Sequence, residues 1–153
     1  MKRIVLLMIV TLWLTGCASS GNQMSDSDKD KAYQQYIVTH KLESVRSIKR
    51  FKLSGWKELT ETHLIITGQF NRDYLISLRN ACTGLRYANW IQLYQFDSLM
   101  FDSRSDSLSG GPQALPIRCR IDAIYPLTKE QVTQIMNIGQ LPTAASNAEQ
   151  VGK

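Results

Sequence analysis

The sequence predicts an α+β domain in which about five or six short strands form a mostly antiparallel sheet, with a short helix at each end and one disulfide. Three observations lead to this prediction. Short β-branched or alternating apolar runs recur between turn-forming residues through the middle of the chain. Helical spacing or caps flank these runs on both sides. The segment predicted to fold, 32–138, is long enough for one hydrophobic core and too short to expect two.

The chain begins with a segment that has the layout of a secretory signal. Lys2 and Arg3 precede an apolar run over residues 4–14. The run is too short to span a membrane, since a spanning helix needs ~20 apolar residues. We therefore predict that this segment directs export.

The residues that follow, Leu14-Thr15-Gly16-Cys17, match the bacterial lipobox of an aliphatic residue, two small residues and Cys. By this resemblance, residues 1–16 are removed as a lipoprotein signal peptide, and Cys17 becomes a lipidated first residue. Several acyl chains on one residue would hold the protein firmly at a membrane. Ala18 stands where, in the enterobacterial sorting scheme, Asp retains lipoproteins in the inner membrane. For a Gram-negative source this predicts the periplasmic face of the outer membrane. An ordinary signal peptide with an incidental Cys is the alternative.

After the lipobox, the composition predicts a tether and then a helix. Residues 17–31 are small, polar or charged, with Met24 as the only large apolar side chain, so we predict a lipidated Cys and a flexible tether. A flexible chain of this length would place the domain on the order of 20 Å from the membrane. The spacing of Ala32, Tyr36 and Leu42 predicts a short helix over 30–42.

The middle of the chain alternates between strand and turn patterns. The best-defined strand is 117–125, because apolar residues at odd positions alternate with charged residues over most of its length. Pro126 is expected to end it. The other expected elements are an extended segment 44–53, a short element 56–59, strands 64–67 and 74–78, a half-turn and strand within 85–94, a strand 98–102, and a loop 103–113.

A second helix is predicted over 129–137. Thr128 and Gln131 form a capping box, in which each side chain can satisfy an orphan backbone amide, and Gly139 is expected to end the helix. Residues 139–153 are rich in small and polar residues and are predicted to form a disordered tail.

Cysteine usage predicts one disulfide. Lipidation of Cys17 leaves Cys82 and Cys119, an even pair in an oxidising compartment. A redox pair would normally be C-x-x-C, and a metal site would need further ligands, for which the mature chain offers only His40 and His63. A structural disulfide is therefore favoured over both. It would link the end of strand 74–78 to strand 117–125.

The charge predicts no nucleic-acid partner. The formal net charge of +5 falls by two, to about +3, when the signal peptide leaves, and export also argues against such a partner. One basic cluster stands out and predicts a surface for anionic lipid headgroups, lipopolysaccharide phosphates or an acidic partner. A scattered, solvated face is the alternative reading. The cluster's chief members are Lys49, Arg50, Lys52, Arg118 and Arg120.

No catalytic, metal or cofactor site is predicted. The chain has no Gly-x-Ser-x-Gly elbow, and its two histidines are expected at the surface or half-buried. The segment 102–106 is not a calcium loop, because Arg104 stands where an oxygen ligand belongs and the required Gly is missing. The acid pairs Glu58/Glu61 and Asp102/Asp106 cannot be placed in space from sequence.

The central block resembles a family of small proteobacterial exported proteins of unknown function. It contains Tyr74-Leu75 followed by Leu78, then the pattern C-x-x-L-x-x-A from Cys82, and later C-x-I-x-x-I from Cys119. The resemblance covers about residues 45–127. It implies a fold and a paired cysteine, and it implies no activity.

These observations lead us to expect a non-enzymatic module of the cell envelope that binds a protein or cell-wall partner. The second hypothesis is a small-ligand or lipid-binding module, with a pocket lined by Trp56, Trp90 and Tyr94. The third is an envelope hydrolase, which would need a cleft where His40 or His63 meets an acid.

Overall fold

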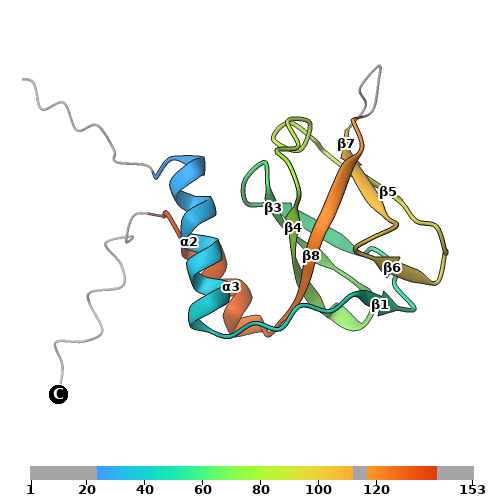
Figure 1. Ribbon diagram of the computed structural model, residues 1–153, viewed down its shortest axis with the longest axis horizontal. Helices are drawn as coiled ribbons and strands as arrows, with labels where there is room; N and C mark the ends of the chain where they lie inside the picture. The colour runs from blue at the N-terminus through green and yellow to red at the C-terminus, as the bar shows by residue number, and fades with distance from the viewer. Residues whose placement is uncertain (1–23, 112–116, 141–153) are drawn as a thin grey trace, which may run out of the picture.

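Short apolar strands assemble into an antiparallel sheet, and two helices pack against one of its faces. The computed structural model describes residues 24–111 and 117–140. Figure 1 shows the helices side by side at one end of the molecule and the curled sheet at the other. The predicted α+β class is confirmed. The elements are α2 (Asp26–Thr39), β1 (Ser47–Lys49), β2 (Gly55–Glu58), β3 (His63–Thr67), η2 (Gln69–Asn71), β4 (Asp73–Leu78), β5 (Ile91–Tyr94), β6 (Met100–Asp102), β7 (Ser107–Gly110), β8 (Cys119–Leu127) and α3 (Lys129–Asn137).

Six of the strands form one sheet in the order β2-β3-β4-β8-β7-β5, with every pair antiparallel. A separate antiparallel pair, β1 with β6, packs its apolar residues Ile48 and Phe101 into the same core as one face of the large sheet. In the described part of the chain, β2 and β5 are therefore the two edges of the large sheet.

The central strands are covered on both faces, which explains their unbroken apolar runs. Leu64 and Ile66 of β3, and Ile76 of β4, point into the main core, which β1 and β6 share. Ile65 and Leu75 point to the other face, where they pack against the helices. Because successive side chains of a strand alternate between faces, one apolar strand serves both cores.

The first helix starts earlier than predicted. We expected a tether through residue 31 and a helix over 30–42, but α2 runs from Asp26 to Thr39. The Ser25 side chain caps it by accepting from the amide of Asp28, and Asp26 and Asp28 lie in its positive first turn. The polar residues that suggested a tether therefore suit a helix N-terminus. The predicted tether residues before Met24 lie outside the described part.

The second helix agrees with the prediction. α3 spans Lys129–Asn137, and both hydrogen bonds of the Thr128–Gln131 capping box are present. Gly139 adopts a φ of 76°, which disfavours other residues. The Tyr36 hydroxyl of α2 donates to the Gln134 side chain of α3 at 2.5 Å, and so links the two helices. The predicted disordered tail lies outside the described residues beyond Gln140.

Three element boundaries differ from the prediction. The extended segment 44–53 pairs as a strand only at Ser47–Lys49, because Arg50 adopts a left-handed φ of 52°. The predicted loop 103–113 contains β7, whose small residues gave no apolar signal. Strand β8 continues through Pro126 to Leu127. Proline is tolerated there because β7 pairs with β8 only at its start, which leaves the far end at an edge.

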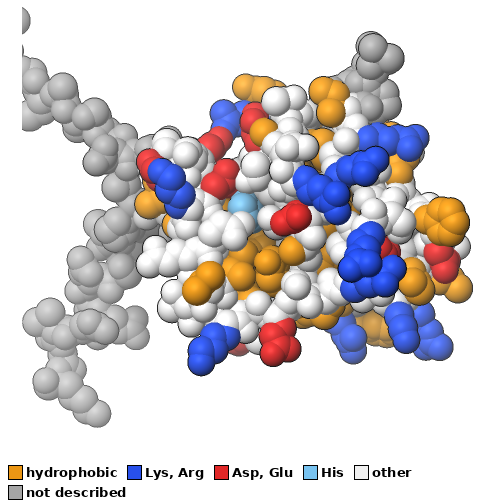
Figure 2. Space-filling view, viewed as in Figure 1, with side chains coloured by type: hydrophobic (Ala, Val, Ile, Leu, Met, Phe, Trp, Pro, Cys, Tyr) orange, Lys and Arg blue, Asp and Glu red, His pale blue; other side chains and the backbone are white. Residues whose placement is uncertain are grey.

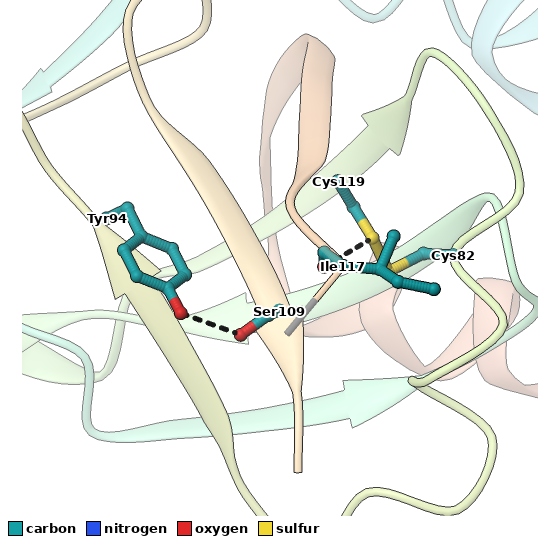
Figure 3. The surroundings of a disulfide bond; sticks show 5 residues. All are labelled: Cys82, Tyr94, Ser109, Ile117 and Cys119. Carbon is teal, nitrogen blue, oxygen red and sulfur yellow. Dashed lines mark hydrogen bonds between the residues drawn. A yellow bond between two sulfur atoms is a disulfide. The ribbon is translucent and has the colours of Figure 1, made fainter. Parts of the chain in front are cut away.

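The predicted disulfide is present between Cys82 and Cys119, whose Cα atoms lie 5.7 Å apart. Figure 3 shows that it joins the loop after β4 to the start of β8. Both cysteines are buried in the main core. The bond thus fixes one end of the two central strands of the sheet.

Candidate functional site

His63 lies in a buried polar cluster where α2 packs on the sheet. We expected a surface or half-buried histidine, but only 3% of the residue is exposed. Its Nδ1 lies 3.0 Å from a carboxylate oxygen of Asp30 on α2, and its Nε2 lies 3.1 Å from the amide nitrogen of Gln34. The Thr60 hydroxyl donates to the same Asp30 oxygen. These contacts join the helix to the loop that precedes β3.

The contacts of His63 favour a neutral ring. The Gln34 amide nitrogen can only donate, so Nε2 accepts and Nδ1 carries the proton that is donated to Asp30. Burial lowers the pKa of His63, and this outweighs the nearby Asp30 carboxylate, which acts in the opposite direction. The third hypothesis needed a histidine and an acid in a cleft. His63 and Asp30 do meet, but the ring is enclosed between helix and sheet.

This cluster predicts a stability that depends on pH. The pKa of folded His63 lies below its unfolded value of 6.5, so between the two values the unfolded chain binds more protons. The contribution of neutral His63 to the free energy of unfolding is fully present above pH 6.5, and it is lost as the pH falls towards and through the folded pKa. Urea unfolding at pH about 7.5 and about 5.5 should show lower stability at the acid end. A His63→Gln variant should show a smaller difference. An equal or larger difference in the variant would contradict the assignment.

The other histidine, His40, lies outside this cluster. Its ring stacks on that of Tyr36 with centroids 3.9 Å apart, and its residue is exposed. The hydrogen-bond partner of the His40 ring is the Tyr36 carbonyl oxygen, 3.1 Å from Nδ1. Among the described residues, His40 therefore forms no pair with a carboxylate.

An open groove lies between β5 and the segment that leads into β2. It has a volume of about 710 Å³. One wall is formed by Arg50–Leu53, and the other by Trp90 and strand β5 with the loop after it. The lining residues are Arg50, Phe51, Lys52, Leu53, Gln69, Trp90, Ile91, Gln92, Leu93, Gln95, Ser98 and Leu99.

Two smaller hollows continue this groove. The first, of about 210 Å³, shares Arg50, Phe51 and Gln69 with it and adds residues of the β3–β4 connection. The second, of about 360 Å³, shares Ile48, Lys49, Arg72 and Tyr74 with the first. Because the three hollows share lining residues, we refer to them together as the β1–β5 groove.

The β1–β5 groove is positively charged. Lys49, Arg50, Lys52 and Arg72 line it. Among the described residues that line it, the one carboxylate is Asp73, which is 6% exposed, lies 2.6 Å from the ammonium of Lys129 and accepts from Thr67 at 2.7 Å. Figure 2 shows several Lys and Arg side chains on the visible surface of the strand end of the molecule. The described lining residues therefore carry a net positive charge.

The structure divides the predicted basic surface. Lys49, Arg50 and Lys52 lie at the groove, whereas Arg118 and Arg120 do not line it. The Arg118 guanidinium stacks over the ring of Tyr94, 4.2 Å from its centroid, and Arg120 is exposed on β8. Arg72 was missing from the prediction, because its contribution depends on the β3–β4 connection folding next to β1.

The three residues of the predicted aromatic pocket do not share one of the described hollows. Trp90 lines the β1–β5 groove, but Trp56 packs against the main core and Tyr94 lies under Arg118. The glutamines that line the groove belong to no sequence motif that predicts a binding site. The sequence predicts an extended segment at Phe51 and Leu53 and gives no sign that they line a groove.

The acidic residues considered for metal or catalysis have structural roles in the β6–β7 connection. Asp102 accepts from the amides of Arg104 and Ser105, and Asp106 accepts from the amides of Phe96 and Asp102. These carboxylates shape the turn. Over residues 24–111 and 117–140 no group of three or more His, Cys, Asp or Glu could hold a metal ion.

The other acid pair, Glu58 and Glu61, lies near Lys29. Partial burial raises the pKa of Glu58, the Glu61 carboxylate adds to this rise, and Lys29 opposes it. None of these residues lines the β1–β5 groove.

Comparisons with known proteins place the chain in a family without supplying an activity. No helix in the described ranges is long and apolar enough to cross a membrane. The predicted signal peptide and Cys17 lie outside those ranges. Neither a curated protein nor a solved structure matches the chain. A family model matches residues 1–137, and the chain therefore belongs to the family of unknown function DUF6491.

Proposed function

We propose that this chain is a lipid-anchored protein on the periplasmic face of the outer membrane, where it binds a partner without catalysing a reaction. The β1–β5 groove carries the proposal. Its main compartment of about 710 Å³ combines apolar side chains with two cationic ones, and Leu99 at its border is 65% exposed. Exposed apolar residues beside a charged groove are typical of a recognition surface.

The anchor supports this role through Cys17 and the residues before it. The lipobox would place the protein in an oxidising compartment, which agrees with the disulfide between Cys82 and Cys119. A module held at a membrane gains effective concentration towards partners in the same envelope. Moderate affinity at the groove would then be sufficient.

A small-ligand role is the second candidate, and the groove volume favours it. Pockets for small molecules typically measure ~300–1,000 Å³, and the main compartment falls within this range. The catalytic alternative has less support, because the histidine that meets a carboxylate is buried under α2.

Site-specific photo-crosslinking in intact cells tests the binding role. A photoreactive residue at Gln92, which is exposed in the groove, should give a covalent adduct of defined mass. The same residue at Thr133, exposed on α3, is the matched control and should give none. A protein-sized or glycan-sized adduct supports the leading proposal, and a small-molecule adduct supports the second candidate. No adduct from the groove, or turnover of an envelope substrate by the purified chain, would contradict the binding role.

A further inference from the structure

We propose that the β1–β5 groove takes an extended acidic segment of a partner protein, which adds a strand to the open edge of β5. The inference rests on the proposed binding role and names the partner class for that groove. Three observations support it. They are the backbone edge of β5, which is unpaired over the described residues, the alternation of exposed with buried or half-buried side chains along residues 50–53, and the positive charge of the groove lining.

The edge of β5 supplies the backbone partner. Over the described residues, β5 pairs with β7 and with no other strand. Its residues Ile91, Gln92 and Leu93 line the groove, so the groove runs along this edge. The free edge of a strand presents amide and carbonyl groups that can pair with another chain. Four residues of strand rise about 13 Å, which is the length that an added segment would follow. Strand addition is an established mode of peptide recognition.

Exposed side chains alternate with buried or half-buried ones along the opposite wall, residues 50–53. Phe51 is buried in the main core, where it stacks on Phe101 with ring centroids 5.0 Å apart, and Leu53 packs against the same core. Arg50 and Lys52, at the alternate positions, are exposed and line the groove. A strand laid between this wall and β5 also alternates its side chains. Its apolar residues would meet the groove floor, and its acidic residues would meet Arg50 and Lys52.

The charge of the lining selects an acidic partner. Lys49 and Arg72 extend the positive lining beyond the main compartment. Asp73, the one acid in the part of the lining that the structure describes, is neutralised by Lys129. Arg50 and Phe70 both adopt left-handed backbone conformations with φ of 52° and 59° at the border of the groove. Such conformations in non-glycine residues are concentrated at functional sites.

The orientation of the groove disfavours the anchoring membrane as its occupant. The described chain begins at Met24, just before α2, and the helices lie at the opposite end from β1 and β6. A chain from Cys17 to Met24 reaches at most about 25 Å when fully extended. The proposed anchor would therefore hold the helical end near the lipid surface and direct the groove towards other components of the envelope.

The test measures binding of short fluorescent peptides to the full chain purified from membranes in detergent. The peptides alternate Val with Glu, Lys or Ser, and one version of the Glu peptide is N-methylated at alternate residues. The Glu peptide should bind more tightly than the Lys and Ser peptides. N-methylation should abolish this binding, because it removes the amide donors that a strand needs. Empty micelles are the blank.

Charge-reversal variants locate the binding. Arg50→Glu with Lys52→Glu should weaken binding of the Glu peptide at least about tenfold. Lys31→Glu with Arg120→Glu, the same change in net charge at exposed sites outside the groove, should leave it within about twofold. If the groove variant fails to fold, the salt dependence of wild-type binding still tests the role of charge, since added salt should weaken binding of the Glu peptide.

Three results would overturn the inference. They are equal binding of the Lys and Glu peptides, full binding of the N-methylated peptide, and displacement of the Glu peptide by phosphatidylglycerol vesicles but not by neutral vesicles. The last result would assign the groove to an anionic lipid. A crosslink from Gln92 in cells without binding of the Glu peptide would refute the acidic strand and leave the binding role standing.

Discussion

Replacing Cys82 and Cys119 together with alanine is expected to lower the free energy of unfolding by about 4 kcal/mol. The bond closes a loop across a sequence separation of 37 residues, and opening it restores chain entropy to the unfolded state. Both residues lie in the main core, so alanine avoids burying a hydroxyl there. Urea unfolding of the variant and the wild-type chain measures the difference.

Reductant provides the internal control for this experiment. It should lower the stability of the wild-type chain towards that of the double alanine variant, and it should leave the variant unchanged. If reduction of the disulfide leaves the unfolding midpoint of the wild-type chain unchanged, a stabilising role for the bond is contradicted.

The second large effect is expected at Gly110, where a methyl group has no room. A Cβ added there would lie 2.7 Å from the carbonyl carbon of Gly84 and 3.0 Å from the amide nitrogen of Leu85. These are backbone atoms, which cannot rotate away as a side chain would. We expect Gly110→Ala to cost about 3 kcal/mol, the upper part of the usual range for overpacking. Thermal or urea unfolding measures this loss.

Gly55→Ala is the matched control for this substitution. Gly55 also lies in a strand, but an added Cβ would meet only the Thr67 side chain, at the ordinary distance of 3.8 Å. The free energy of unfolding of the Gly55→Ala variant should stay within about 1 kcal/mol of wild type. A small gain is favoured, because alanine restricts the unfolded chain. Equal losses in the two variants would show that the close approach to Gly84 is not the cause.

The elements predicted correctly are those whose signals are local. The capping box at Thr128 depends on residues three apart, and the alternation in β8 lies within one strand. The disulfide followed from counting cysteines once Cys17 was assigned to lipidation.

The errors occur where long-range packing decides the structure. Strand β7 has small residues because Gly110 must lie against the backbone of Gly84, a contact between segments far apart in the chain. Composition predicts a tether for the polar start of α2, since composition alone does not distinguish a solvated helix N-terminus from an unfolded segment. It becomes ordered through the Ser25 cap and through the packing of Tyr33 and Ile37 on the sheet.

The candidate site was predictable only in part. The cluster of Lys49, Arg50 and Lys52 is visible in the sequence, and the structure places all three at the groove. The sequence does not show that strand β5 lies opposite these basic residues. The two segments are far apart in the chain and meet only in the folded sheet. The buried pair of Asp30 and His63 was missed for the same reason, since its members come from α2 and β3.

The lipid anchor at Cys17 is the central proposal, because the envelope compartment that we propose follows from it, and the oxidised disulfide agrees with that compartment. Intact mass of the protein purified from membranes, with and without reductant, tests it most directly. We predict the mass of residues 17–153 plus acyl groups, increasing by two hydrogens on reduction of the Cys82–Cys119 bond. An unlipidated mass would contradict the assignment of Cys17, and two free thiols before reduction would contradict the bond and the compartment.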